Sequence, residues 1–390
     1  MNKEELSEEL VDSITKSIAE SLGLKEWPNL KDFGLENLTN VGQGFSCLIM
    51  RLNLVWDDAS SQLPESVILK IASPNYLAQV FPDLKKSDPE AFQLRLEEFN
   101  LSYTHKLEAN LYRFFKDNAS IPLPKFYLYR ELTESQDGVI VLEDLSPTTY
   151  LEDYATGLNV KQVYQVLDAL ASLHAYCIKN TEFLNHFLPR NSASFKDWSN
   201  QLIPNALKLK TLKPDLFEDL FPKFAWCFDH NFLFGYVFEL HNHLNLPPVL
   251  CHGDLWMNNI CFKRDSPNNL AAIFDWQEVH YGIFSEDLMH IILDYCPELV
   301  LDEQKRLAAF EYYLEEVTQK LGYQPFDLGT VVQCCQIVLP YIFARLVYGV
   351  VLALQTSQVL SDQTELCVST LRCLMPQVDR SKKWFEFSKR

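Results

Sequence analysis

The sequence predicts an α+β fold in which a small part built around a β-sheet precedes a larger, mainly helical part. Between about residues 38 and 145, apolar residues come in short runs rich in β-branched side chains, which is typical of sheet strands. After residue 145, long segments with helical spacing dominate. With 390 residues and 47% hydrophobic content, the chain exceeds one ordinary compact unit. We therefore expect two domains, 1–145 and 146–390.

The first domain is predicted to hold a leading helix, at least three strands and one further helix. Residues 1–24 carry acids and lysines where a signal peptide needs a continuous apolar core, so this stretch predicts an amphipathic helix. Strands are expected at 47–56 (CLIMRLNLVW), 66–72 (SVILKIA) and 138–145 (GVIVLEDL). Apolar residues at helical spacing predict a helix over 99–118.

The second domain is predicted to be helical at 160–178, 217–228, 303–322 and 331–354. Of these, only 331–354 is apolar enough to consider as a membrane span. It contains Arg345, and a central arginine costs about 3 kcal/mol on membrane-insertion scales. We expect a buried helix of the helical domain and no membrane association.

Composition limits the choice of partners. With 34 basic and 52 acidic residues the net charge is −18, which opposes binding to nucleic acid or anionic lipid through a general basic surface. The acidity could favour a cationic or neutral substrate, or serve solubility alone. The ten cysteines are scattered without a CxxC pair, as expected of reduced core residues. The sequence therefore predicts a cytoplasmic protein with no obvious protein partner.

The stretch CHGDLWMNNICF, residues 251–262, gathers polar side chains between apolar segments that would hold the loop at both ends. Asp254 and Asn259 lie five residues apart, and the run LAAIFDW brings Asp275 after a further strand. A carboxylate can accept a hydroxyl proton, and amide and carboxylate oxygens are ligands that Mg²⁺ prefers. This order of Asp, Asn and Asp is typical of a phosphotransferase, although the pattern alone is weak.

The first domain offers a matching set of residues. Lys70 is a charged residue inside an apolar strand, where an unpaired ammonium is costly, and Glu108 on the single interior helix is its natural partner. A lysine that extends to water from a strand edge is the alternative. In VGQGFS, Gly42 and Gly44 with Ser46 would let backbone N–H groups approach phosphates, but a simple turn explains two glycines equally well.

These stretches resemble the kinase-like fold of aminoglycoside phosphotransferases and choline kinases. The likeness is greatest to the choline kinase-like branch that includes ecdysteroid kinase-like proteins and a large nematode group. It spans roughly residues 33–288 and rests on FGLENLTNVGQGFSCLIMRLNLVW, LPESVILKIAS, LEANLY, VIVLEDLS, CHGDLWMNNICF and IFDWQEVHYGIFSEDL. The His-Gly-Asp form at 252–254 marks the small-molecule branch, and no Ala-Pro-Glu segment follows Asp275.

The resemblance implies a protein kinase-like, two-lobed enzyme that transfers the γ-phosphate of ATP to a hydroxyl of a choline-like, steroid-like or xenobiotic alcohol. Asp254 would be the catalytic base, and Asn259 with Asp275 would hold Mg²⁺. Lys70 and Glu108, with Gly42, Gly44 and Ser46, would position the phosphates. The backbone of Glu143 and Leu145 would contact adenine, while His252 and Asp287 would support the catalytic loop.

Two other functions stay open at this point. One is a nucleotide-binding pseudokinase that is weakly active or inactive. The other is a metal-dependent hydrolase built from a cluster of possible ligands: His252, Asp254, Asp275, His280, Asp287 and His290. Trp256 and Trp276 flank the loop and would either line a substrate pocket or pack in the core.

Overall fold

The chain folds into two units. In the computed structural model the N-terminal unit takes in Met1–Ala119 and Leu123–Thr148, and the C-terminal unit takes in Ser120–Pro122 and Thr149–Arg390. The division after Thr148 falls close to the predicted boundary after Leu145. The structure describes residues 6–39, 47–57, 62–80, 86, 100–116, 120–153, 156–187, 192–218, 223–355 and 361–388.

The N-terminal unit is built on one five-stranded sheet in the order β1-β2-β3-β5-β4, and its recorded pairings are all antiparallel. The strands are β1 (Leu30–Asn37), β2 (Leu48–Trp56), β3 (Ser66–Ala72), β4 (Phe126–Arg130) and β5 (Gly138–Glu143). β3 lies at the centre, and its apolar run is buried on both sides. Because successive side chains of a strand point to opposite faces, Lys70 and Ile71 face different layers.

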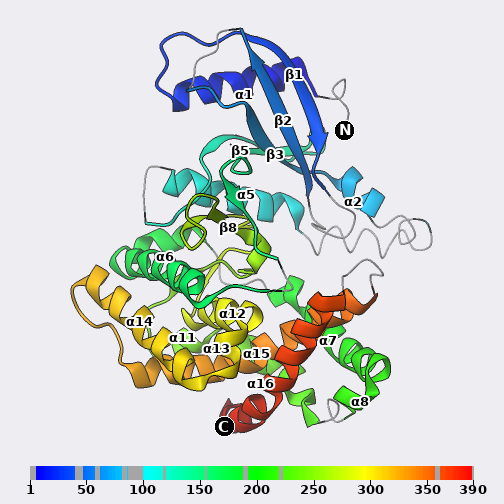
Figure 1. Ribbon diagram of the computed structural model, residues 1–390, viewed down its shortest axis with the longest axis vertical. Helices are drawn as coiled ribbons and strands as arrows, with labels where there is room; N and C mark the ends of the chain where they lie inside the picture. The colour runs from blue at the N-terminus through cyan, green and yellow to red at the C-terminus, as the bar shows by residue number, and fades with distance from the viewer. Residues whose placement is uncertain are drawn as a thin grey trace. The chain divides into compact units, whose positions relative to one another are not determined.

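The helix α1 (Glu8–Ser21) covers one face of this sheet (Figure 1). Its N-cap is Ser7, whose hydroxyl oxygen accepts a hydrogen bond from the Leu10 amide at 3.2 Å. Its apolar stripe includes Ile14 and Ile18, which are fully buried against the sheet and contribute about 2 kcal/mol each. The amphipathic pattern predicted at the N-terminus is therefore a structural helix of this unit.

The helix α5 (Leu101–Phe115) packs against β3, β4 and β5, and it buries Glu108 on the side that meets the sheet. A shorter helix, α2 (Pro74–Val80), follows β3. α5 lies within the predicted range of 99–118. Lys70 and α5 thus lie on the face of β3 opposite to Ile71, which belongs to the cluster formed with α1.

The C-terminal unit is mainly helical. Its principal helices are α6 (Val160–Lys179), α7 (Ser192–Leu212), α12 (Ser285–Tyr295), α14 (Glu303–Leu321), α15 (Leu328–Gln355) and α16 (Ser361–Ser388). Shorter helical segments are η2 (Thr181–His186), α8 (Pro214–Phe217), η3 (Ala225–Phe228), α10 (His230–Phe232), η4 (Leu233–Val237), α11 (Leu240–His243) and α13 (Pro297–Leu301). α6 begins at a capping box. The Gln162 amide donates to Asn159 Oδ1 at 3.1 Å, and the Asn159 amide donates to Gln162 Oε1 at 3.0 Å.

Two small antiparallel sheets stand among these helices. β7 (Val249–Cys251) pairs with β10 (His280–Gly282), while β6 (Thr149–Tyr150), β8 (Ile260–Lys263) and β9 (Leu270–Ile273) form the other sheet. A short 3₁₀ turn, η5 (Met257–Asn259), leads directly into β8. These strands hold both ends of the polar stretch that the sequence singled out.

The predicted helix over 217–228 is wrong in its described part. α8 ends at Phe217, and residues 225–228 form a 3₁₀ turn. The edge strands β1 and β4 were not anticipated. Both pair on one side only and lack the buried apolar runs of the central strands.

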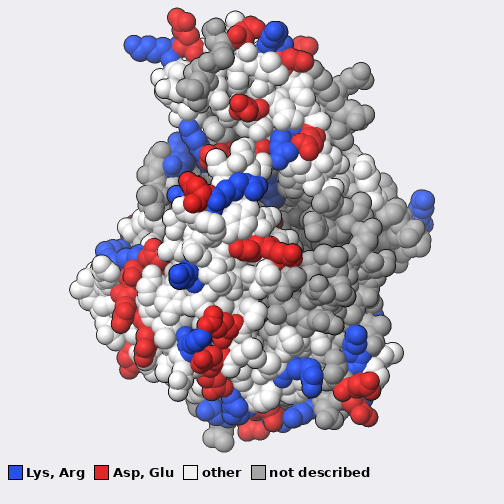
Figure 2. Space-filling model, viewed as in Figure 1, with Lys and Arg blue, Asp and Glu red and all other residues white. Residues whose placement is uncertain are grey.

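The apolar segment predicted as a buried helix is α15. By length and composition, Leu328–Val351 is the one candidate membrane span among the described residues, and 78% of its most apolar window is buried inside the protein. Charge is mixed on the face shown in Figure 2, where the described Lys and Arg side chains lie among Asp and Glu without a continuous basic area.

Candidate functional site

The polar loop at 252–259 is held between buried strands. Leu250 and Cys251 of β7 and Ile260 and Phe262 of β8 are all fully buried, so the loop enters and leaves through packed core. The turn η5 supplies the last residues before β8. The local sequence explains this arrangement. The apolar residues on both sides form buried strands, so the polar residues lie in the short loop that connects these strands.

Asp287 fixes the start of this loop from the first turn of α12. Its Oδ2 accepts a hydrogen bond from the His252 amide at 2.6 Å, and its Oδ1 accepts one from the Gly253 amide at 3.1 Å. Gly253 adopts a left-handed φ of 80°, which glycine reaches without steric cost. Burial raises the pKa of Asp287 from its usual value, although these two hydrogen bonds act in the opposite direction. The carboxylate thus binds the two backbone amides directly before Asp254.

The ring of His252 holds the loop from within. Its Nδ1 accepts the Asp254 amide hydrogen at 3.2 Å, so Nε2 carries the proton that it donates to the Phe274 carbonyl at 3.0 Å. The ring packs on Trp276, with centroids 4.4 Å apart, and both residues are fully buried. Both nitrogens of His252 are engaged, and Trp276 packs in the core, so we infer a structural role for each.

Asp254 itself is half-buried and paired with a residue that the sequence analysis did not assign to the site. Arg345 of α15 donates from Nη2 to Asp254 Oδ1 at 2.6 Å and from Nη1 to the Gly253 carbonyl at 3.2 Å. Arg345 Nη1 also lies 3.2 Å from the hydroxyl of Tyr341, one turn earlier on the same helix. The arginine therefore orients the Asp254 carboxylate through one oxygen and ties it to the loop backbone.

Asn259 and Asp275 lie on the segments that follow. The Asn259 side-chain nitrogen donates to the Asp254 backbone carbonyl at 2.9 Å, which leaves its oxygen as the acceptor end of the amide. The Phe274 amide donates to the Asn259 carbonyl at 2.9 Å, joining this turn to the residue before Asp275. Asp275 has a φ of 64°, and residues held in this region cluster at functional sites. The two side chains offer oxygen donors of the kind that Mg²⁺ prefers.

In the N-terminal unit, Lys70 of β3 and Glu108 of α5 form a buried ion pair. Lys70 Nζ lies 2.6 Å from Glu108 Oε2, and the two side chains are 7% and 1% exposed. Breaking such a pair by removing one partner is costly because it leaves a buried charge. His105, one turn earlier on α5, stays neutral because burial lowers its pKa to about 4. Of the two basic side chains Lys70 and His105, it is therefore Lys70 that carries the positive charge beside Glu108.

Glu143 and Leu145 lie at the end of β5, with Asp144 between them. Asp144 Oδ2 accepts from Arg51 Nε and from the Ser66 hydroxyl, each at 2.7 Å, and its Oδ1 accepts from the Ser146 amide at 3.0 Å. Burial raises the pKa of Asp144, but these hydrogen bonds prevail and the pKa is lowered. The segment is thereby anchored to β2 and β3. The predicted phosphate-contacting residues Gly42, Gly44 and Ser46 lie outside the described residues.

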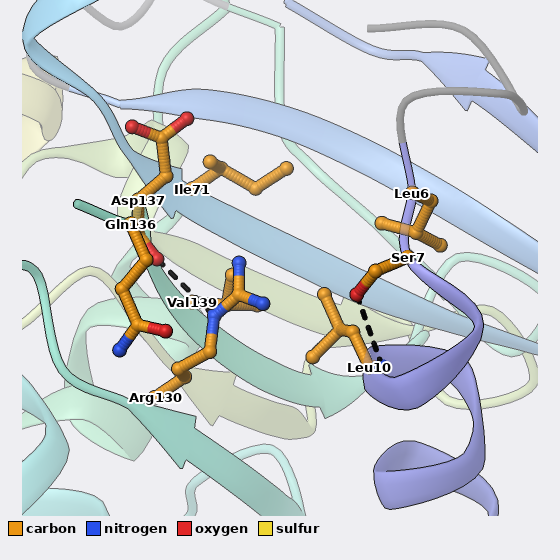
Figure 3. Close-up of a pocket in the computed structure, with 8 residues that line it drawn as sticks. All are labelled: Leu6, Ser7, Leu10, Ile71, Arg130, Gln136, Asp137 and Val139. Carbon is orange, nitrogen blue, oxygen red and sulfur yellow. Dashed lines mark hydrogen bonds between the residues drawn. The ribbon is translucent and has the colours of Figure 1, made fainter.

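A pocket of about 230 Å³ lies on the α1 face of the N-terminal sheet (Figure 3). Leu6, Ser7 and Leu10 line it from α1 and its cap, and Ile71 lines it from β3. It lies on the face of β3 opposite to Lys70. Among the described residues that line it, none belongs to the predicted nucleotide or metal site.

Comparison with known families and proteins adds an independent finding. Residues 18–376 match the DUF1679 family, described as "Uncharacterized oxidoreductase dhs-27". The chain belongs to this family. Two Caenorhabditis elegans proteins are similar to it. "Uncharacterized oxidoreductase dhs-27" is 25% identical over 78% of this chain and 37% of its own length, and "Uncharacterized kinase-like protein D1044.1" is 26% identical over 55% and 57%. The matches thus span less than two thirds of either relative.

A solved structure shows the fold of this DUF1679 member. A putative aminoglycoside phosphotransferase from Ralstonia eutropha superposes with a TM-score of 0.51 at 11% identity, covering 96% of this chain and 98% of that one. The predicted α+β, protein kinase-like fold, with a small sheet-based N-terminal part and a mainly helical C-terminal part, is confirmed. The likeness at this identity shows the fold alone.

Within the C-terminal unit of this DUF1679 chain, the structure links Asp254, Asn259, His252 and Asp287 in one hydrogen-bonded loop. Within the N-terminal unit it joins Lys70 to Glu108. The sequence analysis missed Arg345 as a site residue. A signal was present, since an arginine in an apolar helix needs an anionic partner by the reasoning applied to Lys70.

Proposed function

We propose that the protein is an ATP-dependent phosphotransferase that moves the γ-phosphate to a hydroxyl group of a small molecule. The observation that carries the proposal is the Asp254 carboxylate, oriented by Arg345 in a loop that Asp287 and His252 fix. The kinase-like fold supports it, as do the names of a similar kinase-like protein and of the putative aminoglycoside phosphotransferase. We assign the acceptor to a choline-like, steroid-like or xenobiotic alcohol and place the reaction in the cytoplasm.

In this proposal Asp254 is the catalytic base. Arg345 engages Oδ1, and among the described residues no hydrogen bond to Oδ2 is formed, so Oδ2 is the oxygen that would accept the hydroxyl proton. The nearby guanidinium fixes the direction of the carboxylate. A positioned base contributes about 10²- to 10⁴-fold to such a reaction.

The donor groups fit a magnesium nucleotide. Asn259 directs its amide nitrogen to the Asp254 carbonyl and so keeps its oxygen for a cation, and Asp275 supplies a carboxylate. In the N-terminal unit the buried Glu108 holds the Lys70 ammonium, which would then bind phosphate oxygens. When bound, Mg-ATP supplies the phosphoryl group and the cation that offsets its charge. The backbone at Glu143 and Leu145, which Asp144 anchors, would receive the adenine.

The alternatives fit the described residues less well. For the metal-dependent hydrolase, His252 and Asp287 are already committed to backbone groups of the loop. For an oxidoreductase, dinucleotide-binding folds use parallel strands, whereas the recorded pairings of the N-terminal sheet are antiparallel. The oxidoreductase name also describes a relative of which the match covers 37%. A pseudokinase would share the geometry and differ only in lacking turnover.

An acceptor screen tests the proposal. The purified chain is incubated with Mg-ATP and a panel of choline analogues, sterols and xenobiotic alcohols, and ADP release is measured. We expect acceptor-dependent turnover that Asp254→Asn abolishes and that Asp265→Asn, a change at an exposed aspartate between β8 and β9, preserves. Wild-type protein that binds Mg-ATP yet phosphorylates no member of the panel would favour the pseudokinase instead.

A further inference from the structure

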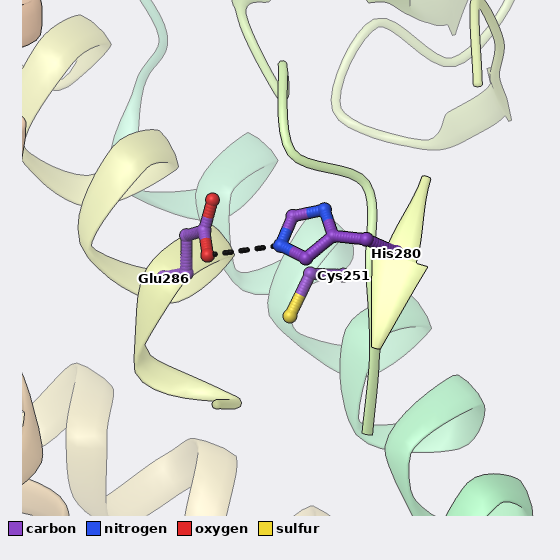
Figure 4. Close-up of side chains that lie close together, drawn as sticks. All are labelled: Cys251, His280 and Glu286. Carbon is purple, nitrogen blue, oxygen red and sulfur yellow. Dashed lines mark hydrogen bonds and ion pairs between the residues drawn. The ribbon is translucent and has the colours of Figure 1, made fainter. Parts of the chain in front are cut away.

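Three side chains that the proposed phosphotransfer does not use converge behind the catalytic loop (Figure 4). They are Cys251, His280 and Glu286, and their ligand atoms lie within 4.8 Å of one another. All three residues are buried, with exposed fractions of at most 4%. The β7–β10 pairing sets Cys251 opposite His280, and the first turn of α12 brings in Glu286. The register of the β7–β10 pair and the position of the first turn of α12 therefore bring the three side chains together.

The hydrogen bonds of His280 indicate that a proton or a metal cation belongs between its ring and the Glu286 carboxylate. Nδ1 lies 2.8 Å from the Glu278 carbonyl oxygen, which can only accept, so Nδ1 carries a hydrogen. In the neutral ring Nε2 then has a bare lone pair. It faces Glu286 Oε2, another acceptor, at 3.2 Å. Either a proton, carried by the ring or by the carboxyl group, or a metal ion must bridge the two atoms.

The third group of the cluster favours the metal. Cys251 Sγ lies within 4.8 Å of the ligand atoms of His280 and Glu286 and, as a thiol, contacts the Ile283 carbonyl at 3.5 Å. A thiolate, an imidazole and a carboxylate are the donors that Zn²⁺ takes, whereas Mg²⁺ and Ca²⁺ take oxygen alone. One thiolate and one carboxylate balance the charge of a divalent ion, which removes the cost of burying it. The thiol proton would leave to solvent on binding.

The surroundings of the cluster are those of a supported metal site. The Glu278 carbonyl fixes the His280 ring, as partners of metal-binding histidines commonly do. The Tyr341 hydroxyl lies 3.5 Å from Glu286 Oε1. Residue 282 is glycine, and a Cβ there would lie 3.4 Å from Cys251 Sγ and 3.5 Å from the His280 ring. Glycine therefore leaves the side next to both ligand atoms free of a side chain.

We propose that Cys251, His280 and Glu286 bind one Zn²⁺ ion, which ties β7, β10 and α12 together through three protein ligands. Cys251 directly precedes His252, and Glu286 directly precedes Asp287. The ion thus holds both partners of the contact by which Asp287 fixes the catalytic loop. The site is separate from the predicted magnesium ligands Asn259 and Asp275.

Metal analysis of the full chain tests this site without any assay of phosphotransfer. Protein expressed with added zinc and purified without chelator should carry about one zinc ion per chain. Cys251→Ser and His280→Asn should each lower the zinc content at least about tenfold, because each removes a ligand. Cys261→Ser is the matched control, since Cys261 is equally buried on β8, outside the cluster, and should leave the zinc content unchanged.

Cobalt substitution gives a second readout on the wild-type chain itself. The Co²⁺ form should show the near-ultraviolet charge-transfer absorption of a cobalt–thiolate bond, which Cys251→Ser removes and Cys261→Ser keeps. Near-ultraviolet circular dichroism checks that each variant is folded. Wild-type protein that retains no zinc and shows no thiolate band with cobalt would mean that His280 and Glu286 form a plain ion pair. A Cys251→Ser variant with the same zinc content as wild type would also overturn the proposal.

Discussion

Replacing Asp287 by asparagine tests the contact that fixes the polar loop at 252–259. The carboxylate accepts the amides of His252 and Gly253 at 2.6 and 3.1 Å, and its residue is fully buried. Asparagine keeps one acceptor but turns an NH₂ group toward the other amide. A buried amide left without an acceptor costs about 1–3 kcal/mol, and the remaining bond loses its charge. Because burial raises the pKa of Asp287, the variant recovers part of the cost of burying the charge.

We therefore expect Asp287→Asn to destabilise the C-terminal unit by about 2 kcal/mol, which lowers the melting temperature by roughly 4–8 °C for a unit of this size. Tryptophan fluorescence is a suitable signal, because the buried Trp276 packs on His252. The exposed control Asp265→Asn should stay within about 0.5 kcal/mol of wild type. If Asp287→Asn melts within about 1 °C of wild type, the two hydrogen bonds do not hold the loop as described.

Three further predictions follow from the ion pairs. Lys70→Met should destabilise the N-terminal unit by about 3–5 kcal/mol, measured by urea unfolding, because it leaves Glu108 as a buried charge without its partner. The double variant Lys70→Met/Glu108→Leu should recover most of this loss. An equal loss of stability in the single and double variants would contradict the buried pair. Arg345→Met should lower kcat about tenfold and leave the KM for ATP unchanged, whereas Arg345→Lys should keep part of the wild-type kcat. A change in KM alone would argue against a role for Arg345 in positioning Asp254. The folded pKa of Asp144 is lowered, so its stabilisation is present above the unfolded pKa of about 4 and is lost as pH falls through the folded value. Asp144→Asn should thus be less stable than wild type at pH 7 and equal to it in strong acid, and a gap independent of pH would refute this assignment.

The central elements of the fold could be predicted because their sequence signals are local. β3 is apolar from Val67 to Ala72 except at Lys70, and α1, α5 and α6 repeat apolar residues at helical spacing. The edge strands were missed since each pairs on one side and faces water on much of its surface, which dilutes the apolar pattern.

The candidate site was predictable only where its residues lie in one short motif or carry an unusual charge. Asp254 and Asn259 share a loop, and Lys70 stood out as a charge in an apolar strand. Arg345 lies 91 residues from Asp254, and nothing in sequence spacing links them. Cys251 and His280 meet only through the β7–β10 register, which the sequence does not specify.

The most direct test of the central claim is phosphorus NMR of Mg-ATP incubated with an accepted alcohol and the purified protein. Phosphotransfer predicts a new phosphomonoester signal that grows in step with ADP. Asp254→Asn should slow its growth by at least about 100-fold, while Asp265→Asn should leave it unchanged. A phosphomonoester that forms at the same rate with Asp254→Asn would contradict the assignment of Asp254 as the catalytic base.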